Sequence, residues 1–268
     1  MGRIVETLTP VVNPFCSPAA LAQSNYCLFD GKRLVRHDAG EPPSNMTSFV
    51  HNSFRALMLN EHFTCVGAKA AVRQGSYRFG FYPTLASAAS SAGLAHDLFN
   101  FVQEASSFAG EFTTFVASFG GPLAPDEAAF ESLLWSTLQQ LHDADAEHHH
   151  WDQKVAADTA DPQFSFSFGE TAFFVVGLHA ASSRATRRFA WPTLIFNPHE
   201  QFDRLKKEGR YQRFQQVIRA AEQGLQGNIN PMLANFGDRS EASQYSGRQV
   251  GTDWRCPFHA RVEQKEHE

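Results

Sequence analysis

Phenylalanine is the feature of this sequence that most restricts how the chain can fold. The 268 residues include 25 Phe, compared with 5 Tyr and 4 Trp. A phenyl ring carries no polar atom that could pair with water, so this many rings require a wide apolar interior. The hydrophobic fraction of 43% supplies a sizeable core and excludes a wholly disordered chain. The interior is either a Phe-rich core or a space that encloses a flat, apolar ligand.

The balance of charges and the thiol content disfavour several classes of protein. The net charge of -5 argues against nucleic acid as a partner, because phosphate binding requires a basic surface. The sequence has no run of about 18 apolar residues that could span a membrane, and residues 1–14 lack the apolar segment of a secretory signal. Four cysteines without a C-x-x-C pair are too few and too scattered for a disulfide framework or a structural zinc site. We therefore expect a cytoplasmic protein with reduced thiols.

Helical and strand patterns alternate irregularly along the chain, which predicts an α+β fold. Apolar residues at intervals of three and four predict helices at 49–58, 66–75, 85–105, 126–141, 199–207 and 211–226. Apolar or alternating runs predict strands at 77–82, 112–119, 164–168, 172–178 and 193–196. We expect Gly169-Glu170 to form a hairpin turn, and Ser48 and Asn197 to cap helices. The prediction is a single domain at 48–268 with a mixed sheet flanked by helices, preceded by an irregular arm at 1–47 and ending in an irregular but packed tail.

Cys65 is the first candidate for chemistry. A thiolate directly before a helix receives backbone N–H groups and the positive end of the helix dipole. Gly67, two residues later, would let a flat group approach the backbone closely. This Cys-x-Gly pattern is typical of heme proteins in which a thiolate binds the iron and the donated N–H groups set its electron density. A buried structural cysteine at a helix start is the alternative interpretation.

The stretch His148-His149-His150-Trp151-Asp152 is the second candidate. Neighbouring histidines point in different directions in a helix or a strand, so three in a row cannot all bind one ion without a loop. Two histidines with a carboxylate could form a non-heme iron site. A polar helix-to-loop segment explains the same residues without a metal.

His179 ends an apolar strand, and an arginine-rich turn follows it. This turn contains Arg184, Arg187 and Arg188. Arginine binds carboxylates and phosphates through paired N–H groups, so the turn could hold an anion. His179 itself could be an axial metal ligand or a distal polar group, whereas a solvated basic loop is the simpler interpretation.

Other motifs give little support to further functions. His199 follows Asn197 and Pro198 at a predicted helix start, where a structural role is sufficient. The sequence has no G-x-G-x-x-G pattern, no Walker loop and no G-x-S-x-G elbow. Nucleotide-driven chemistry and serine hydrolysis are therefore not indicated.

Several short motifs follow one another from Phe49 to Phe258. They include Phe63-Thr64-Cys65, Phe173-Phe174-Val175-Val176-Gly177-Leu178-His179, Phe196-Asn197-Pro198-His199-Glu200-Gln201-Phe202, Gln244-Tyr245-Ser246-Gly247-Arg248 and Trp254-Arg255-Cys256-Pro257-Phe258. In this order they resemble the YqcI/YcgG family, which includes heme-dependent N-hydroxylases of guanidino compounds in guanitoxin and D-cycloserine biosynthesis. Thr64 and Ala180 depart from the family pattern, in which proline is common at both positions.

The resemblance implies a heme b cofactor and a monooxygenase that hydroxylates a guanidino or amino nitrogen. Conversion of L-arginine to Nω-hydroxy-L-arginine is the leading reaction. The oxidant would be O2 or H2O2, and O2 would require an external electron donor because the chain has no flavin or nicotinamide motif. The alternatives are a non-heme metal enzyme using the His148–Asp152 cluster and a non-catalytic heme carrier or sensor. The oligomeric state stays open, a homodimer included.

The resemblance also suggests which residues hold the heme. Cys65 is the preferred axial ligand, ahead of His179, and the further options are His199 and Cys256. Gly67 would lie against the cofactor, and propionates or a substrate carboxylate would be bound by Arg184, Arg187, Arg188 and Arg248. A buried substrate cation requires a carboxylate partner. The candidates for it are Asp143, Asp145, Asp152 and Glu170, and no catalytic residue is assigned.

Overall fold

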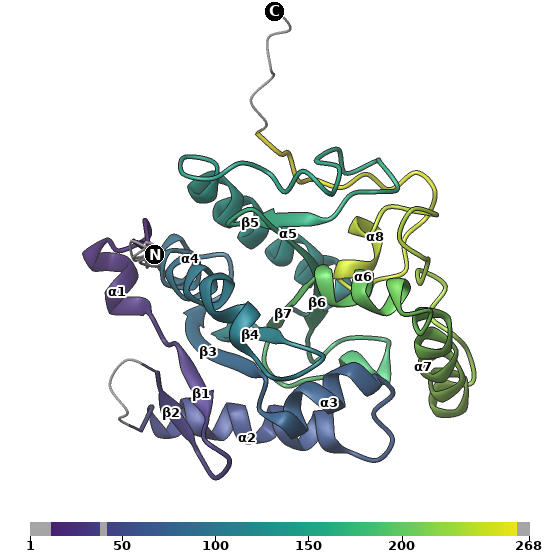
Figure 1. Cartoon of the computed structure of the whole chain (residues 1–268), viewed down its shortest axis with the longest axis horizontal. Helices are drawn as coiled ribbons and strands as arrows, with labels where there is room; N and C mark the ends of the chain where they lie inside the picture. Colours follow the sequence, from purple (N-terminus) through teal and green to yellow (C-terminus); the bar gives the residue numbers. More distant parts are fainter. Residues whose placement is uncertain (1–11, 38–41, 262–268) are drawn as a thin grey trace, which may run out of the picture.

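One mixed sheet runs through the molecule (Figure 1). The computed structural model describes residues 12–37 and 42–261. In these residues seven strands form a sheet in the order β2-β1-β3-β4-β7-β6-β5. The strands are β1 (Cys27–Phe29), β2 (Leu34–Arg36), β3 (Tyr77–Thr84), β4 (Thr114–Gly121), β5 (Phe166–Phe168), β6 (Thr171–Leu178) and β7 (Thr193–Pro198). Only β3 and β4 pair in parallel, and the other neighbours are antiparallel. The predicted α+β fold with a mixed sheet is confirmed.

Helices flank both faces of this sheet (Figure 1). They are α1 (Pro18–Gln23), α2 (Asn45–Leu59), α3 (Val66–Gln74), α4 (Ala88–Glu104), α5 (Glu127–Asp145), α6 (Glu200–Lys207), α7 (Tyr211–Gln226) and α8 (Ala242–Tyr245), with 3-10 turns at Ala105–Ser107 and Ala185–Arg187. Within the described ranges, no helix combines the length and the apolar character needed to cross a membrane.

Each sheet face has its own apolar cluster. On one face, Phe130 and Leu134 of α5 pack with Phe115 and Phe196 of the sheet. On the other, α2 and α3 cover a cluster that includes Phe79, Val116 and Ile195. Sixteen of the 25 Phe side chains are buried, so most of the rings build the core itself.

The main helix and strand boundaries follow the sequence pattern, whereas two predicted caps are wrong. Helix α2 begins earlier than expected, because Ser44 rather than Ser48 accepts a hydrogen bond from the Thr47 N–H. Asn197 does not cap α6; it lies in β7, and its amide donates to the Phe174 carbonyl at 3.1 Å. The partner of this side chain lies in the neighbouring strand β6, so the residues next to Asn197 in the sequence could not predict it.

The N-terminal segment, predicted as an irregular arm, contains regular secondary structure. Residues 1–11 and 38–41 of this predicted arm lie outside the described ranges, but the remainder forms α1, β1 and β2. Strand β1 pairs with β3, so the segment supplies one edge of the sheet. The carboxylate of Asp97 in α4 fixes it by accepting hydrogen bonds from the Ser24 hydroxyl (2.5 Å) and the Asn25 N–H (2.7 Å). Strands of three residues are too short to show an alternating pattern, which explains why the sequence did not predict them.

Candidate functional site

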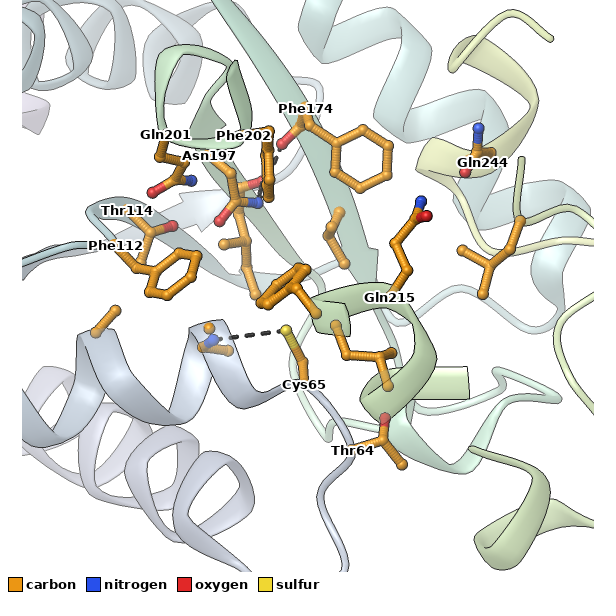
Figure 2. Close-up of a pocket in the computed structure, with 18 of the residues that line it drawn as sticks. Thr64, Cys65, Phe112, Thr114, Phe174, Asn197, Gln201, Phe202, Gln215 and Gln244 are labelled. Carbon is orange, nitrogen blue, oxygen red and sulfur yellow. Dashed lines mark hydrogen bonds between the residues drawn. The ribbon is translucent and has the colours of Figure 1, made fainter. Parts of the chain in front are cut away.

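A cavity of about 240 Å³ lies between the start of α3, the sheet, and helices α6 and α7 (Figure 2). Its wall is mainly apolar and comes from chain segments far apart in sequence. The apolar lining includes Met58, Phe112, Phe174, Val176, Leu178, Ile195, Phe202, Phe214, Ile218 and Phe236. The charged and titratable lining consists of Cys65, Arg187, His199, Lys206, Tyr211, Arg219, Glu222 and Glu241. An apolar pocket with a few polar groups in its wall is typical of a small-molecule site.

Cys65 lies at the helix start where the sequence placed it. It is the N-cap residue of α3, and its Sγ accepts a hydrogen bond from the Ala68 N–H at 3.5 Å (Figure 2). Burial raises the pKa of this thiol; the N–H groups of Ala68 and Gly67 lower it, and the Glu222 carboxylate raises it further. The thiol is therefore protonated at neutral pH and must release its proton to bind a metal.

Gly67 brings two aromatic rings close to the backbone of α3. A Cβ atom at this position would lie 3.2 Å from the ring of Phe112 and 3.3 Å from that of Phe214. These two rings stack on each other with centroids 5.4 Å apart. The flat groups that approach Gly67 in this structure are therefore side chains of the protein.

His179 lies on the other face of the sheet from Cys65. Phe174, Val176 and Leu178 of β6 line the cavity, so the residues between them face α5. The His179 ring stacks on Phe130 of α5 at 4.2 Å between centroids, and within the described ranges neither ring nitrogen has a hydrogen-bond partner. The two residues named as metal ligands cannot bind one iron together, because the sheet separates them.

Of the four arginines expected to bind anions, only Arg187 lines the cavity. Arg184 is buried, does not line the cavity and pairs with Glu222 at 3.5 Å. Arg188 is exposed and donates to the Ser182 carbonyl. Arg248 pairs with Glu131 of α5 at 2.7 Å, on the opposite face. The arginines thus serve separate parts of the fold.

The histidine-rich stretch holds a hairpin in place. Asp145 is hydrogen-bonded to the His149 Nδ1 at 2.7 Å and accepts a hydrogen bond from the Gly169 N–H. Asp152 accepts one from the Ala172 N–H at 3.0 Å. In the part of the chain that the structure describes, no three His, Cys, Asp or Glu side chains come together as a metal site. The four carboxylates named for the substrate cation, Asp143, Asp145, Asp152 and Glu170, all lie outside the cavity lining.

Two cavity carboxylates, Glu222 and Glu241, were not among the sequence candidates. Glu222 follows Phe214 and Ile218 at intervals of four on α7, so it interrupts an apolar helix face. That interruption is a signal that the sequence contained. Glu241 lies in the irregular tail, where no periodic pattern distinguishes it.

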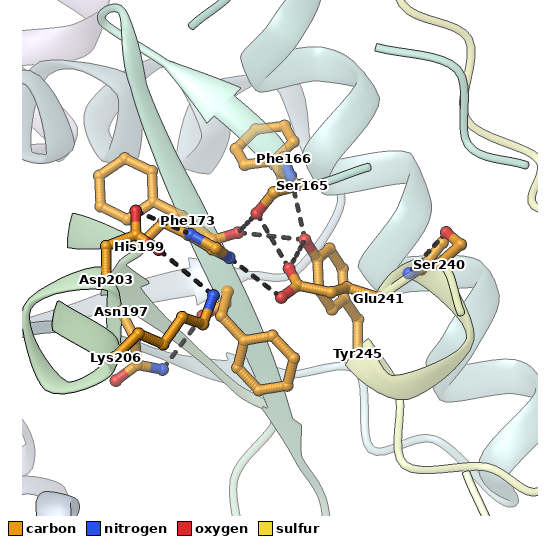
Figure 3. A network of polar contacts seen from close by, with 12 residues as sticks. Ser165, Phe166, Phe173, Asn197, His199, Asp203, Lys206, Ser240, Glu241 and Tyr245 are labelled. Carbon is orange, nitrogen blue, oxygen red and sulfur yellow. Dashed lines mark hydrogen bonds and ion pairs between the residues drawn. The ribbon is translucent and has the colours of Figure 1, made fainter. Parts of the chain in front are cut away.

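His199 is held between two carboxylates at one side of the cavity (Figure 3). Its Nε2 lies 3.2 Å from the Glu241 Oε1, and its Nδ1 lies 3.7 Å from the Asp203 Oδ2. Glu241 also accepts a hydrogen bond from the Ser165 hydroxyl, and Lys206 pairs with Asp203. Burial opposes the imidazolium charge, but the two carboxylates more than offset this and raise the pKa of His199 to about 9. The residue is a cation at neutral pH.

This network predicts a stability change at alkaline pH. The folded pKa of His199 lies above its ordinary value of 6.5, so its contribution is complete below about pH 6.5 and disappears as the pH rises through about 9. We expect the melting temperature difference between wild type and His199→Gln to be largest near about pH 6 and smallest near about pH 10. Thermal unfolding of both proteins across this range measures it. A difference that is constant with pH would contradict the ion-pair assignment.

The fold and the cavity define an α+β protein with an apolar cavity that contains a cysteine at a helix start. Residues 54–259 match the family model described as YqcI/YcgG family. The chain therefore belongs to the YqcI/YcgG family. No curated protein and no solved structure gave a significant match.

Proposed function

We propose that the protein is a heme-dependent monooxygenase that hydroxylates a guanidino or amino nitrogen, with L-arginine as the leading substrate. One observation carries the proposal: a cysteine sulfur at the start of a helix faces an apolar cavity (Figure 2). A thiolate ligand gives heme the chemistry of oxygen activation. The N–H groups of Ala68 and Gly67 would moderate the charge on the sulfur.

The cavity contains a sulfur atom that could bind the iron of a heme. The volume of the cavity, however, is small for a heme. A volume of about 240 Å³ is below the roughly 300–1,000 Å³ of ligand pockets for larger molecules. A heme therefore requires the outer wall, helix α7, to shift outward. Glu222 is the only buried residue of α7, and the helix lies between Gly209 and Gly227, both with a positive φ angle. Such a shift would have to break the Phe112–Phe214 stack and the Arg184–Glu222 pair, which both join α7 to the rest of the fold.

The charges in the cavity wall suit both ends of the proposed complex. Arg187, Lys206 and Arg219 supply positive charge for carboxylates such as heme propionates. Glu222 and Glu241 are the carboxylates in the cavity wall, and a guanidinium would share them with their present partners Arg184 and His199. With O2 the balanced reaction consumes two electrons and two protons and yields the N-hydroxy product and water, so a separate reductase must supply the electrons. With H2O2 the products are the N-hydroxy compound and water, and no reductant is needed.

The test is hemin titration followed by a turnover assay. We expect the purified protein to bind hemin with a strong Soret band, and its reduced carbon monoxide complex to absorb at the longer wavelength that distinguishes thiolate from histidine ligation. With peroxide or with a reductase system, mass spectrometry should detect one added oxygen on L-arginine. Hemin binding without any hydroxylated product would favour a carrier or sensor. Absence of hemin binding would overturn the proposal.

A further inference from the structure

Arg187 is a buried cation for which residues 12–37 and 42–261 supply no ion-pair partner. Its side chain is 8% exposed and lines the cavity. Nη1 donates to the carbonyl oxygens of Tyr245 (2.8 Å) and Gly177 (3.4 Å). In the described ranges, no carboxylate lies within 4.0 Å of this guanidinium, and Nε and Nη2 have no hydrogen-bond partner. A buried charge of this kind is costly unless a partner of opposite charge binds it.

The surroundings of Arg187 fix its position and leave its charge uncompensated. Gly247 has a φ angle of +83°, and a Cβ atom there would lie 2.6 Å from the Arg187 Cδ, so this glycine makes room for the side chain. Among the acidic residues Glu222 has the largest effect on the pKa of Arg187, but its carboxylate already pairs with Arg184 and accepts a hydrogen bond from the Asn230 N–H. Burial lowers the pKa of Arg187 to about 10, Glu222 raises it and Arg184 lowers it. The group is therefore charged at neutral pH.

We propose that the free Nε and Nη2 edge of Arg187 binds a carboxylate of the molecule that occupies the cavity. Two parallel N–H donors on a planar guanidinium match the two oxygens of a carboxylate. The backbone carbonyls that hold Nη1 orient this edge before the ligand arrives, which reduces the entropic cost of binding. The identity of the carboxylate rests on the proposed function: it belongs either to an amino-acid substrate or to a heme propionate.

The experiment compares probes that differ only in the carboxylate. L-arginine is matched with agmatine, which has the same guanidinium and no carboxylate, and hemin is matched with its dimethyl ester. Binding to wild type, Arg187→Gln and Arg187→Lys is measured by calorimetry for the small molecules and by absorption for the porphyrins. Arg188→Gln removes the same charge from the exposed neighbouring position and serves as the control. Thermal unfolding checks that every variant is folded.

A substrate carboxylate predicts that Arg187→Gln weakens L-arginine binding by roughly 10- to 100-fold and leaves agmatine binding unchanged. A propionate predicts the same loss for hemin and none for its ester. In either case Arg187→Lys should retain part of the affinity, because it keeps the charge and loses the paired donors, and Arg188→Gln should match wild type. An equal loss for both members of a pair, or no loss for any probe, overturns the carboxylate site.

These outcomes also separate this site from the proposed function. If wild type binds no hemin but Arg187→Gln selectively loses L-arginine binding, the heme proposal fails and the carboxylate site stands. If hemin binds to a thiolate and Arg187→Gln changes nothing, the function stands and the carboxylate site fails. If wild type binds none of the four probes, both are overturned.

Discussion

Replacing Cys65 with serine should remove heme binding while leaving the fold intact. Serine is a preferred N-cap residue, so its hydroxyl can accept the Ala68 N–H in place of the sulfur and hold the start of α3. The iron would lose its proposed ligand. We expect hemin affinity to fall by at least about 100-fold, since even the loss of a residue that only orients a metal ligand costs roughly 10- to 100-fold. Product formation should fall to the background level, while the melting temperature of the hemin-free protein stays close to that of wild type.

Cys256→Ser is the matched control for this substitution. Cys256 lies outside the cavity, packed against the α4 and α5 side of the core, and burial raises the pKa of its thiol to about 12. We expect Cys256→Ser to bind hemin as wild type does. The reverse result, with loss in Cys256→Ser and an unaltered spectrum in Cys65→Ser, would show that the ligand assignment is wrong.

The pH dependence of hemin binding gives a second signature of Cys65. Because burial raises the pKa of its thiol, ligation must release a proton at neutral pH. Hemin affinity of wild type should therefore rise with pH, and Cys65→Ser should lack this slope. A wild-type affinity that is independent of pH contradicts a thiol ligand with a raised pKa.

The largest effect on stability is expected at Gly177. A Cβ atom there would lie 2.5 Å from Cε1 of Phe130 and 3.0 Å from Cδ1 of Leu134, in a fully buried part of the core. His179 stacks on the same Phe130 ring, so the ring cannot move aside freely. We expect Gly177→Ala to destabilise the protein by about 2–3 kcal/mol, in the range of overpacked cores. Denaturant unfolding measures this difference.

Gly224→Ala is the control for the same chemical change. A Cβ atom at this position of α7 meets no atom within 4 Å. Alanine is favoured over glycine in a helix by roughly 1 kcal/mol, so this variant should be slightly more stable than wild type. If both variants shift stability in the same direction, crowding around Phe130 is not the cause at Gly177.

The sequence predicted best the long helices, whose apolar spacing and N-cap residues lie within the helix itself or directly before it. Helix α7 spans the predicted residues Tyr211–Gln226, and α3 starts directly after Cys65, because amphipathic spacing and a cap are encoded within the helix itself. The pairing of β1 with β3 joins residues about 50 positions apart and has no local signature. Contacts of that kind become visible only in three dimensions.

The cavity was predictable in part for the same reason. Cys65 could be singled out because the sequence places it directly before a helix, where backbone N–H groups can stabilise a thiolate. The strand pattern of β6 shows that Val176 and His179 point to opposite faces, but not which face carries the cavity. Glu241 was missed because its role depends on His199, 42 positions earlier, and not on its neighbours in the chain.

The residues that line the cavity are spread along the sequence from Met58 to Gln244. A nascent chain that ends before Gln244 lacks part of this wall, so the pocket is completed only late in synthesis. Any small molecule that binds inside is therefore expected to enter after most of the chain has been made.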